Sequence, residues 1–170
     1  TTPIQLCLMT AQIANGGYKI YPKIVIDELN KNQPQDKFTP LYKDSKNIRI
    51  VQDAMFGSTN EVMGTSYRSR INDPKYQFAG KTGTAQVKKI TEKDRELDLK
   101  TFEIPYEERD HALYIAFGPY KNPRYALSIL VEHGGNGSTT AAPMAKKLFK
   151  LIIDRHSLRE SINDKKYMDI

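Results

Sequence analysis

The apolar residues of the N-terminal stretch cover nearly every face of a helix instead of forming one stripe. Thr2 precedes Pro3, and Gln5 stands where a capping box places its glutamine, so the spacing predicts a helix that begins at Pro3. Gly16 and Gly17 end it. Because a helix that is apolar all round is typically buried, we expect other parts of the protein to enclose this one.

Two further helices are indicated by apolar residues at helical spacing. An amphipathic helix is predicted at about 47–58. A last helix is predicted at about 139–155, after the glycine-rich stretch, with Ser138 as its candidate cap. The polar tail 157–170 is expected to fray, so we divide the chain into one domain, 1–156, and this tail.

Three segments have the composition of strands: 76–89, 111–117 and 125–131. The turn-rich stretch 118–123 joins the last two, which predicts an antiparallel hairpin. The hairpin strands are apolar without clean alternation, so we expect both faces of the sheet to be covered. The fold class is therefore α+β, with an antiparallel sheet of about three main strands packed with helices.

The remaining segments are interpreted as connections. A short extended segment is predicted at 18–25, polar loops at 30–42 and 91–109, and irregular structure at 59–75. The chain of 170 residues contains no apolar run long enough to cross a membrane. Since the first residue is Thr1 and not methionine, and an ordered-looking segment starts at once, we expect the chain to be a piece of a longer protein.

The charge of +6 is spread along the chain and interleaved with acids, as in 92–96, which indicates a solvated surface and not a nucleic-acid footprint. A basic domain would also suit an anionic wall polymer or an anionic lipid surface. Cys7 is the single cysteine, which excludes an internal disulfide, and it has no partners at metal-ligand spacing. We expect it to be a small core residue.

The predicted strand 76–89 carries the run Lys81-Thr82-Gly83-Thr84, flanked by small residues. The lysine brings a compact cation, the threonines bring hydroxyls, and the glycine leaves room for another backbone to approach. Strand alternation puts Lys81 and Thr82 on opposite faces. Both side chains can reach one ligand only at a sheet edge, so we predict an edge strand beside a cleft.

Lys-Thr-Gly-Thr is also one of three active-site motifs of serine acyl-transferases that react with penicillin. The resemblance extends to the helix 2–17 and to the segments 110–119 and 131–135. By these residues the chain is identified as a member of the class B penicillin-binding proteins. It is most similar to the elongation-type members, and it resembles the C-terminal part of the β-lactamase/transpeptidase-like fold.

The resemblance implies a peptidoglycan D,D-transpeptidase that cross-links stem peptides ending in D-Ala-D-Ala through a serine acyl-enzyme and is acylated by β-lactams. Lys81 would bias proton transfer and attract the anionic substrate. The hydroxyls of Thr82 and Thr84 would bind the substrate carboxylate, Gly83 would leave the edge open, and the Thr84 N–H would serve the oxyanion hole. No cofactor, metal or nucleic acid is implied.

The same resemblance implies a place at the periplasmic face of the bacterial inner membrane, with the anchor outside this chain. Its implied partners are the upstream part of the same domain and other cell-elongation proteins. The pattern is incomplete, however, because the sequence contains no Ser-x-x-Lys, the motif of the nucleophile. Ser58-Thr59-Asn60 matches the second motif, Ser-x-Asn, by letters but lies too close to Lys81, and we interpret it as coincidence. The chain alone is expected to be inactive.

Two alternatives stay open: a non-catalytic binding or interaction fragment, and a relative of the serine β-lactamases. A phosphate-binding loop is excluded, because position 75 is lysine where that motif needs glycine, and a strand follows Lys81 where it needs a helix. His111 and His133 are interpreted as structural. The stretch 136–140, next to the hairpin end, is a further candidate for substrate contact.

Overall fold

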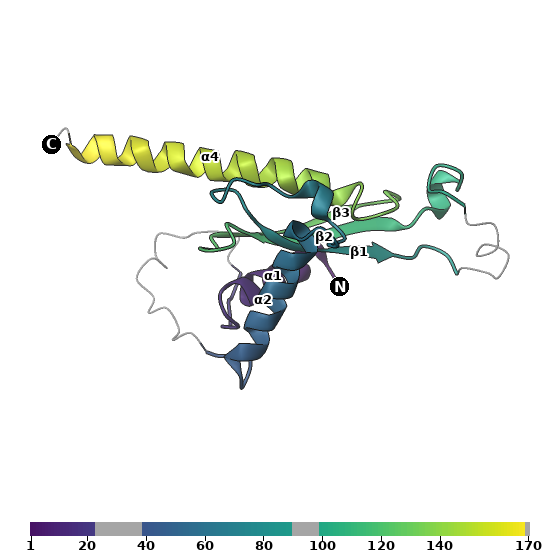
Figure 1. The fold of residues 1–170 in the computed structure, drawn as a ribbon, viewed down its shortest axis with the longest axis horizontal. Helices are drawn as coiled ribbons and strands as arrows, with labels where there is room; N and C mark the ends of the chain where they lie inside the picture. Colours follow the sequence, from purple (N-terminus) through teal and green to yellow (C-terminus); the bar gives the residue numbers. More distant parts are fainter. Residues whose placement is uncertain (23–38, 90–98, 169–170) are drawn as a thin grey trace.

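The computed structural model describes residues 1–22, 39–89 and 99–168. In chain order the elements are α1 (Pro3–Ala14), α2 (Ser45–Asn60), the 3₁₀ turn η2 (Tyr67–Ser69), β1 (Ala79–Ala85), the 3₁₀ turn η3 (Tyr106–Glu108), β2 (His111–Gly118), β3 (Tyr125–Val131) and α4 (Ala141–Met168) (Figure 1). Most of the predicted loop 30–42, half of the connection 91–109 and the end of the extended segment 18–25 lie outside the described residues.

The three strands form one antiparallel sheet in the order β1-β2-β3, which confirms the predicted hairpin and the α+β class. β1 is shorter than the predicted strand 76–89. Its register explains why: β2 begins at His111, which faces Ala85, so β1 has no pairing partner beyond that residue. In the described part of the chain β1 pairs with β2 alone and is an edge strand, as predicted.

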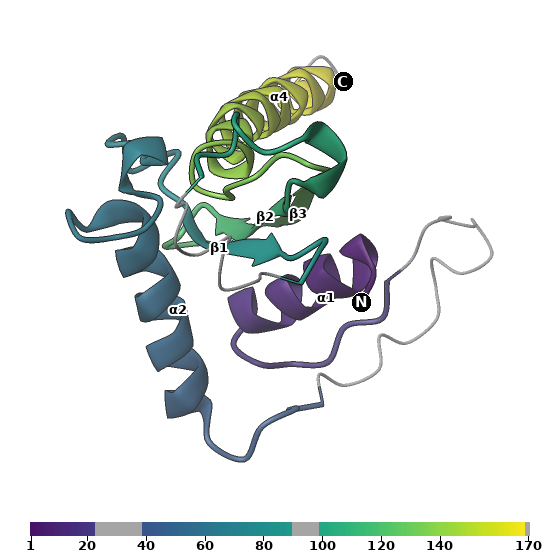
Figure 2. The ribbon, with the colours of Figure 1, turned by 90° about the vertical axis from the view of Figure 1, so that its right-hand side faces the viewer.

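Helices cover both faces of the sheet, as the strand pattern predicted (Figure 2). On the side of α4 the core contains Tyr114 of β2 and the stacked rings of Phe78 and Phe149, whose centroids lie 4.9 Å apart. On the side of α1 and α2 it contains Phe117 and Met55. This two-sided burial holds the sheet that carries the motif.

The first helix begins as predicted, but the described residues do not enclose it. The Thr2 N–H donates to Gln5 Oε1 at 2.8 Å and the Gln5 N–H to Thr2 Oγ1 at 3.4 Å, which completes the capping box. Thr10 is the helix's one fully buried residue, whereas Ile4 is 50% exposed and Met9 39%. The described residues cover only the side of α1 that faces β2, β3 and α2, so its enclosure by further parts of the protein stays a prediction. Cys7 is half-buried on that side.

The last helix begins later and ends later than predicted. It starts at Ala141, so Ser138 is not its cap but lies in the preceding turn, where its hydroxyl donates to Asn136 Oδ1 at 2.8 Å. It continues to Met168 and does not fray after Ser157 (Figure 1). The stretch 157–168 contains no glycine or proline to stop a helix, and it is rich in helix-forming residues. The division at residue 156 stays a prediction.

The second helix is slightly longer than the predicted 47–58 and lies against β1. Asp44 caps it by accepting the Lys46 N–H at 2.8 Å. At its other end Asn60 Nδ2 donates to the carbonyl of Phe78, just before β1, at 2.9 Å. No helix within the described ranges combines the length and apolar character that crossing a membrane requires.

Candidate active site

The Lys-Thr-Gly-Thr run lies on β1 at the open edge of the sheet. Lys81 and Thr84 are exposed, and Thr82 and Gly83 are half-buried. Although Lys81 and Thr82 start on opposite faces, Lys81 Nζ reaches around the edge and donates to the Thr82 carbonyl at 3.0 Å and to Thr82 Oγ1 at 3.2 Å. The edge therefore brings a cation and a hydroxyl to one place, as the sequence predicted.

A row of hydroxyl groups continues from this edge to α2. Thr65 Oγ1 lies 3.4 Å from Thr82 Oγ1 and 3.1 Å from Ser58 Oγ. Thr65 follows Gly64, where a Cβ would come within 2.4 Å of the Ser58 carbonyl oxygen, so only glycine allows the chain to pass this close to the end of α2. An open cavity of about 340 Å³ lies beside this row and is lined by Lys81, Thr65, Ser58 and their neighbours on α2.

A buried hydroxyl cluster fixes this arrangement from beneath. The phenol oxygen of Tyr114, on β2, lies 3.0 Å from Thr59 Oγ1 and 3.0 Å from Ser66 Oγ. Burial raises the pKa of Tyr114, and the two hydroxyl contacts oppose that rise. Gly80 gives the phenol its space, since a Cβ there would lie 2.4 Å from the phenol oxygen. The cluster joins α2, the turn at Ser66 and the sheet directly below the motif.

The stretch 136–140 also lies against the motif strand. A Cβ on Gly137 would come within 2.4 Å of the Leu113 carbonyl oxygen and 2.7 Å of that of Gly83, so this glycine rests on the backbone of β1 and β2. The structure thus brings the predicted substrate-contact loop to the motif. Contact with substrate itself stays a prediction.

The two histidines of the hairpin bond to each other and to backbone. His133, at a backbone φ of 52°, donates its N–H to His111 Nδ1 at 2.9 Å, and its own Nδ1 lies 3.1 Å from the Arg109 carbonyl. They join the two ends of the hairpin, which agrees with a structural role. Across the described ranges, no three histidine, cysteine or acidic side chains gather as a metal site.

The sequence pointed to the four motif residues, but it did not reveal Thr65, and it gave Ser58-Thr59-Asn60 no role. In the structure Ser58 is part of the hydroxyl row. Thr59 contacts the phenol of Tyr114, and Asn60 donates to the carbonyl of Phe78. The signal that was available is Gly64, a glycine directly after a helix and directly before a threonine.

Comparisons with known proteins agree with this fold. The model of the family "Penicillin binding protein transpeptidase domain" matches residues 1–150, and the chain belongs to this family. The chain is 32% identical over 165 residues to the peptidoglycan D,D-transpeptidase MrdA of Salmonella typhimurium, an alignment that covers 90% of the chain and 25% of that relative.

Two solved structures are similar in fold and sequence. The complex between the penicillin-binding protein PBP2 and MreC of Helicobacter pylori aligns with a TM-score of 0.64 at 32% identity and covers 89% of this chain and 25% of that one. Pseudomonas aeruginosa PBP2 in complex with WCK 5153 aligns with a TM-score of 0.60 at 34% identity, covering 86% and 28%. The chain thus spans about a quarter of the length of the relatives that it matches.

Proposed function

We propose that the chain forms one wall of the active site of an elongation-type peptidoglycan D,D-transpeptidase, a serine enzyme that cross-links stem peptides and is acylated by β-lactams. The observation that carries this proposal is the position of Lys81, whose ammonium group folds over the edge of β1 onto the Thr82 hydroxyl in a chain of the transpeptidase family. An exposed cation and hydroxyl on an edge strand suit a peptide that ends in a carboxylate.

Each motif residue has a role in this proposal. The serine, outside this chain, forms a bond to the penultimate D-alanine carbonyl carbon, the peptide C–N bond breaks, and terminal D-alanine leaves with a proton. An amine of a neighbouring stem then displaces the serine. Lys81 helps to move the proton, and the hydroxyls of Thr82 and Thr84 hold the terminal carboxylate. Gly83 leaves the edge open, and the Thr84 N–H stabilises the oxyanion, a contribution of about 2.7–4 kcal/mol.

The proposal places the full-length protein at the periplasmic face of the inner membrane, beside other cell-elongation proteins. The H. pylori relative supports the second point, since it was solved as a complex between PBP2 and MreC. The other half of the cleft belongs to the upstream part of the same domain. No Ser-x-x-Lys stands in these 170 residues, so the chain alone forms no acyl-enzyme. A purely interacting role is the alternative that this absence favours.

Fluorescent penicillin labelling tests the proposal. The full-length protein should label covalently, and Lys81→Ala should slow labelling by about 100-fold or more, the usual scale for losing a proton-transfer group. The control is Lys43→Ala, which removes another exposed lysine, one that precedes α2 in the chain. It should leave the labelling rate unchanged. The 170-residue chain should not label. A Lys81→Ala protein that labels at the normal rate would contradict the role of the motif.

A further inference from the structure

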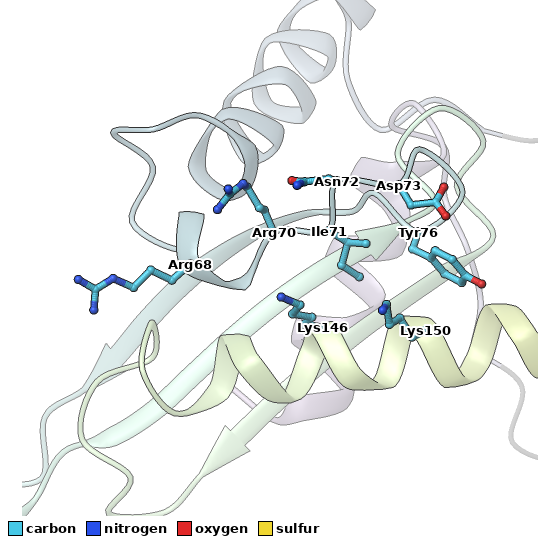
Figure 3. A pocket seen from close by; sticks show the side chains of 8 residues that line it. All are labelled: Arg68, Arg70, Ile71, Asn72, Asp73, Tyr76, Lys146 and Lys150. Atoms are coloured by element: carbon cyan, nitrogen blue, oxygen red, sulfur yellow. The ribbon is translucent and has the colours of Figure 1, made fainter.

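A second hollow lies on the α4 side of the motif strand, between α4 and the segment 64–76. It consists of two cavities of about 810 and 360 Å³ that share Arg68, Lys146 and Lys150 in their walls. Figure 3 shows Lys146 and Lys150 extending from α4 toward the opposite wall, which carries Arg68 and Arg70. We call this hollow the basic groove; the cations that line it are Arg68, Arg70, Lys146, Lys147 and Lys150.

The positive charge of the basic groove meets few acidic side chains within the described residues. Its five cations form no ion pair there, and Asp73 is the one acid in its walls. Asp73 accepts the backbone N–H of Lys75 at 2.9 Å. The nearest acid on α4, Asp154, is bound by Lys75 at 3.0 Å, and the more distant charge of Lys150 also attracts it. Lys146 and Lys150 are one helical turn apart, so they present their charges on the same face of α4.

The basic groove lies next to the cavity that contains Lys81. Gly64 and Thr65 line both its larger cavity and the cavity that contains Lys81. Thr65 Oγ1 is 3.4 Å from Thr82 Oγ1, so Thr65 joins the strand edge to the wall of the groove. Ser138 and Thr139, from the loop that rests on β1, also line the larger cavity.

We propose that the basic groove binds the carboxylate-bearing part of a peptide strand whose D-alanyl end lies at β1. This inference rests on the proposed function, and it adds a second site for the same substrate class. Five cations lining one hollow, with a single acid in its walls, suit several carboxylates along an extended chain. Polar side chains such as Asn72, Ser138 and Thr139 add hydrogen-bonding groups for peptide.

The geometry favours a peptide over a nucleic acid or a membrane. Single-stranded nucleic acids stack on free aromatic faces, but Arg70 covers Tyr67 at 3.8 Å and Lys75 lies over Tyr76 at 4.8 Å. A membrane surface is met by a flat or protruding basic face with apolar residues beside it. Here the cations line a concavity that shares Gly64 and Thr65 with the cavity beside Lys81.

A binding titration of the full-length protein, followed by the fluorescence anisotropy of labelled peptides, tests the inference. The probes are an acidic peptide that ends in D-Ala-D-Ala, the same peptide with its side-chain carboxylates amidated, and the acidic peptide with its terminal carboxylate amidated. The test variant is Lys146→Gln with Lys150→Gln. The matched control is Lys43→Gln with Lys121→Gln, which removes the same charge from exposed lysines outside the groove.

The test variant should bind the acidic peptide about five- to tenfold more weakly, as expected for two solvent-screened charge contacts, while the control variant binds normally. Amidated side chains should weaken binding to the original chain by a similar factor, and added salt should reduce the difference. Equal binding of the acidic and the amidated peptides would overturn the inference. It would also be overturned if the test variant bound the acidic peptide normally and lost only binding to vesicles of anionic phospholipid. Failure of the proposed function looks different: amidation of the D-alanyl terminus and Lys81→Ala would then leave binding unchanged.

Discussion

At the scale of single residues, the candidate site includes side chains that lie outside the Lys-Thr-Gly-Thr motif. The ammonium of Lys81 and the hydroxyls of Thr82, Thr65 and Ser58 form one row of contacts, each 3.0–3.4 Å long. Because Thr65 lies between α2 and β1, it is a positioning residue for Thr82. Its effect on catalysis can be separated from a simple loss of stability.

Thr65→Val in the full-length protein should slow penicillin acylation by about two- to tenfold, the scale of one neutral hydrogen bond. The isosteric change keeps the volume and removes the hydroxyl that contacts Thr82 and Ser58. Thr65→Ser restores a hydroxyl and should recover most of the rate. If serine and valine variants are equally slow, the hydroxyl contact is not what positions Thr82.

Tyr114→Phe should lower the free energy of unfolding by about 1–3 kcal/mol, because it leaves the buried hydroxyls of Thr59 and Ser66 without the phenol oxygen. Since burial raises the pKa of Tyr114, the unfolded chain releases this proton at a lower pH than the folded one. The tyrosine's stability contribution is then complete below the ordinary pKa of about 10 and falls as the pH rises above it.

Urea unfolding of the 170-residue chain and of its Tyr114→Phe variant at pH 7 and near pH 11 measures both effects. The difference between the two proteins should narrow at the higher pH. If the difference in the free energy of unfolding instead grew with pH, burial would not be what raises the pKa of the Tyr114 phenol in the folded chain.

At the scale of elements, the loop before α4 supports the motif strand through backbone contact. Gly137→Ala places a methyl group within 2.7 Å of the carbonyl oxygens of Leu113 and Gly83, which a backbone contact cannot accommodate without moving the loop or the strand. We expect slower acylation of the full-length protein and shifted amide resonances at Gly83 and Thr84. Gly16→Ala also strains the backbone, through its φ of +91°, but at a site away from the motif, and it should leave the resonances of Gly83 and Thr84 unchanged. Unchanged motif resonances in Gly137→Ala would exclude the proposed support.

The sequence predicted those features of the elements that nearby residues determine. It did not predict the bounds that depend on packing between elements. The capping box at Thr2, the hairpin after residue 118 and the edge position of the motif strand were all predicted. The length of β1 was not, because it depends on where β2 offers partners. The end of α4 was missed because polarity was interpreted as fraying, although nothing in 157–168 stops a helix.

The candidate site shows the same division. Lys81 to Thr84 are adjacent in the chain, so a short motif reveals them. The hydroxyl row and the basic groove are assembled from segments about 15 to 80 residues apart in the sequence, such as Thr65 with Thr82 and Arg68 with Lys150. The prediction of a solvated basic surface rested on interleaved charges such as those at 92–96, and it did not reveal the hollow, because Arg68 and Arg70 meet Lys146 and Lys150 only in the fold.

At the scale of the whole molecule, apolar side chains of α1 and of the turn after α2 are left uncovered by the described residues. Met63 is 94% exposed, Val62 74% and Ile4 50%. Exposed apolar surface favours association. In the full-length protein, we expect the upstream part of the domain to cover at least the side that carries Ile4.

The 170-residue chain should therefore self-associate as its concentration rises, in a way that added salt does not reverse. Sedimentation velocity measures this. Ile4→Glu together with Met9→Glu places charges on the exposed side of α1 and should shift the chain toward monomer. A chain that is monomeric at all concentrations would show that these side chains are not sufficient for association.

The central claim is that the main chain and hydroxyls of Lys81-Thr82-Gly83-Thr84 grip an anionic peptide end beside an open strand edge. A crystal structure of the full-length protein acylated by a penicillin tests it most directly. The account predicts the ligand alongside β1, with its carboxylate within hydrogen-bond distance of the Thr82 and Thr84 hydroxyls and its acyl oxygen accepting the Thr84 N–H. A ligand that is bound covalently but has no contact with these four residues would contradict it.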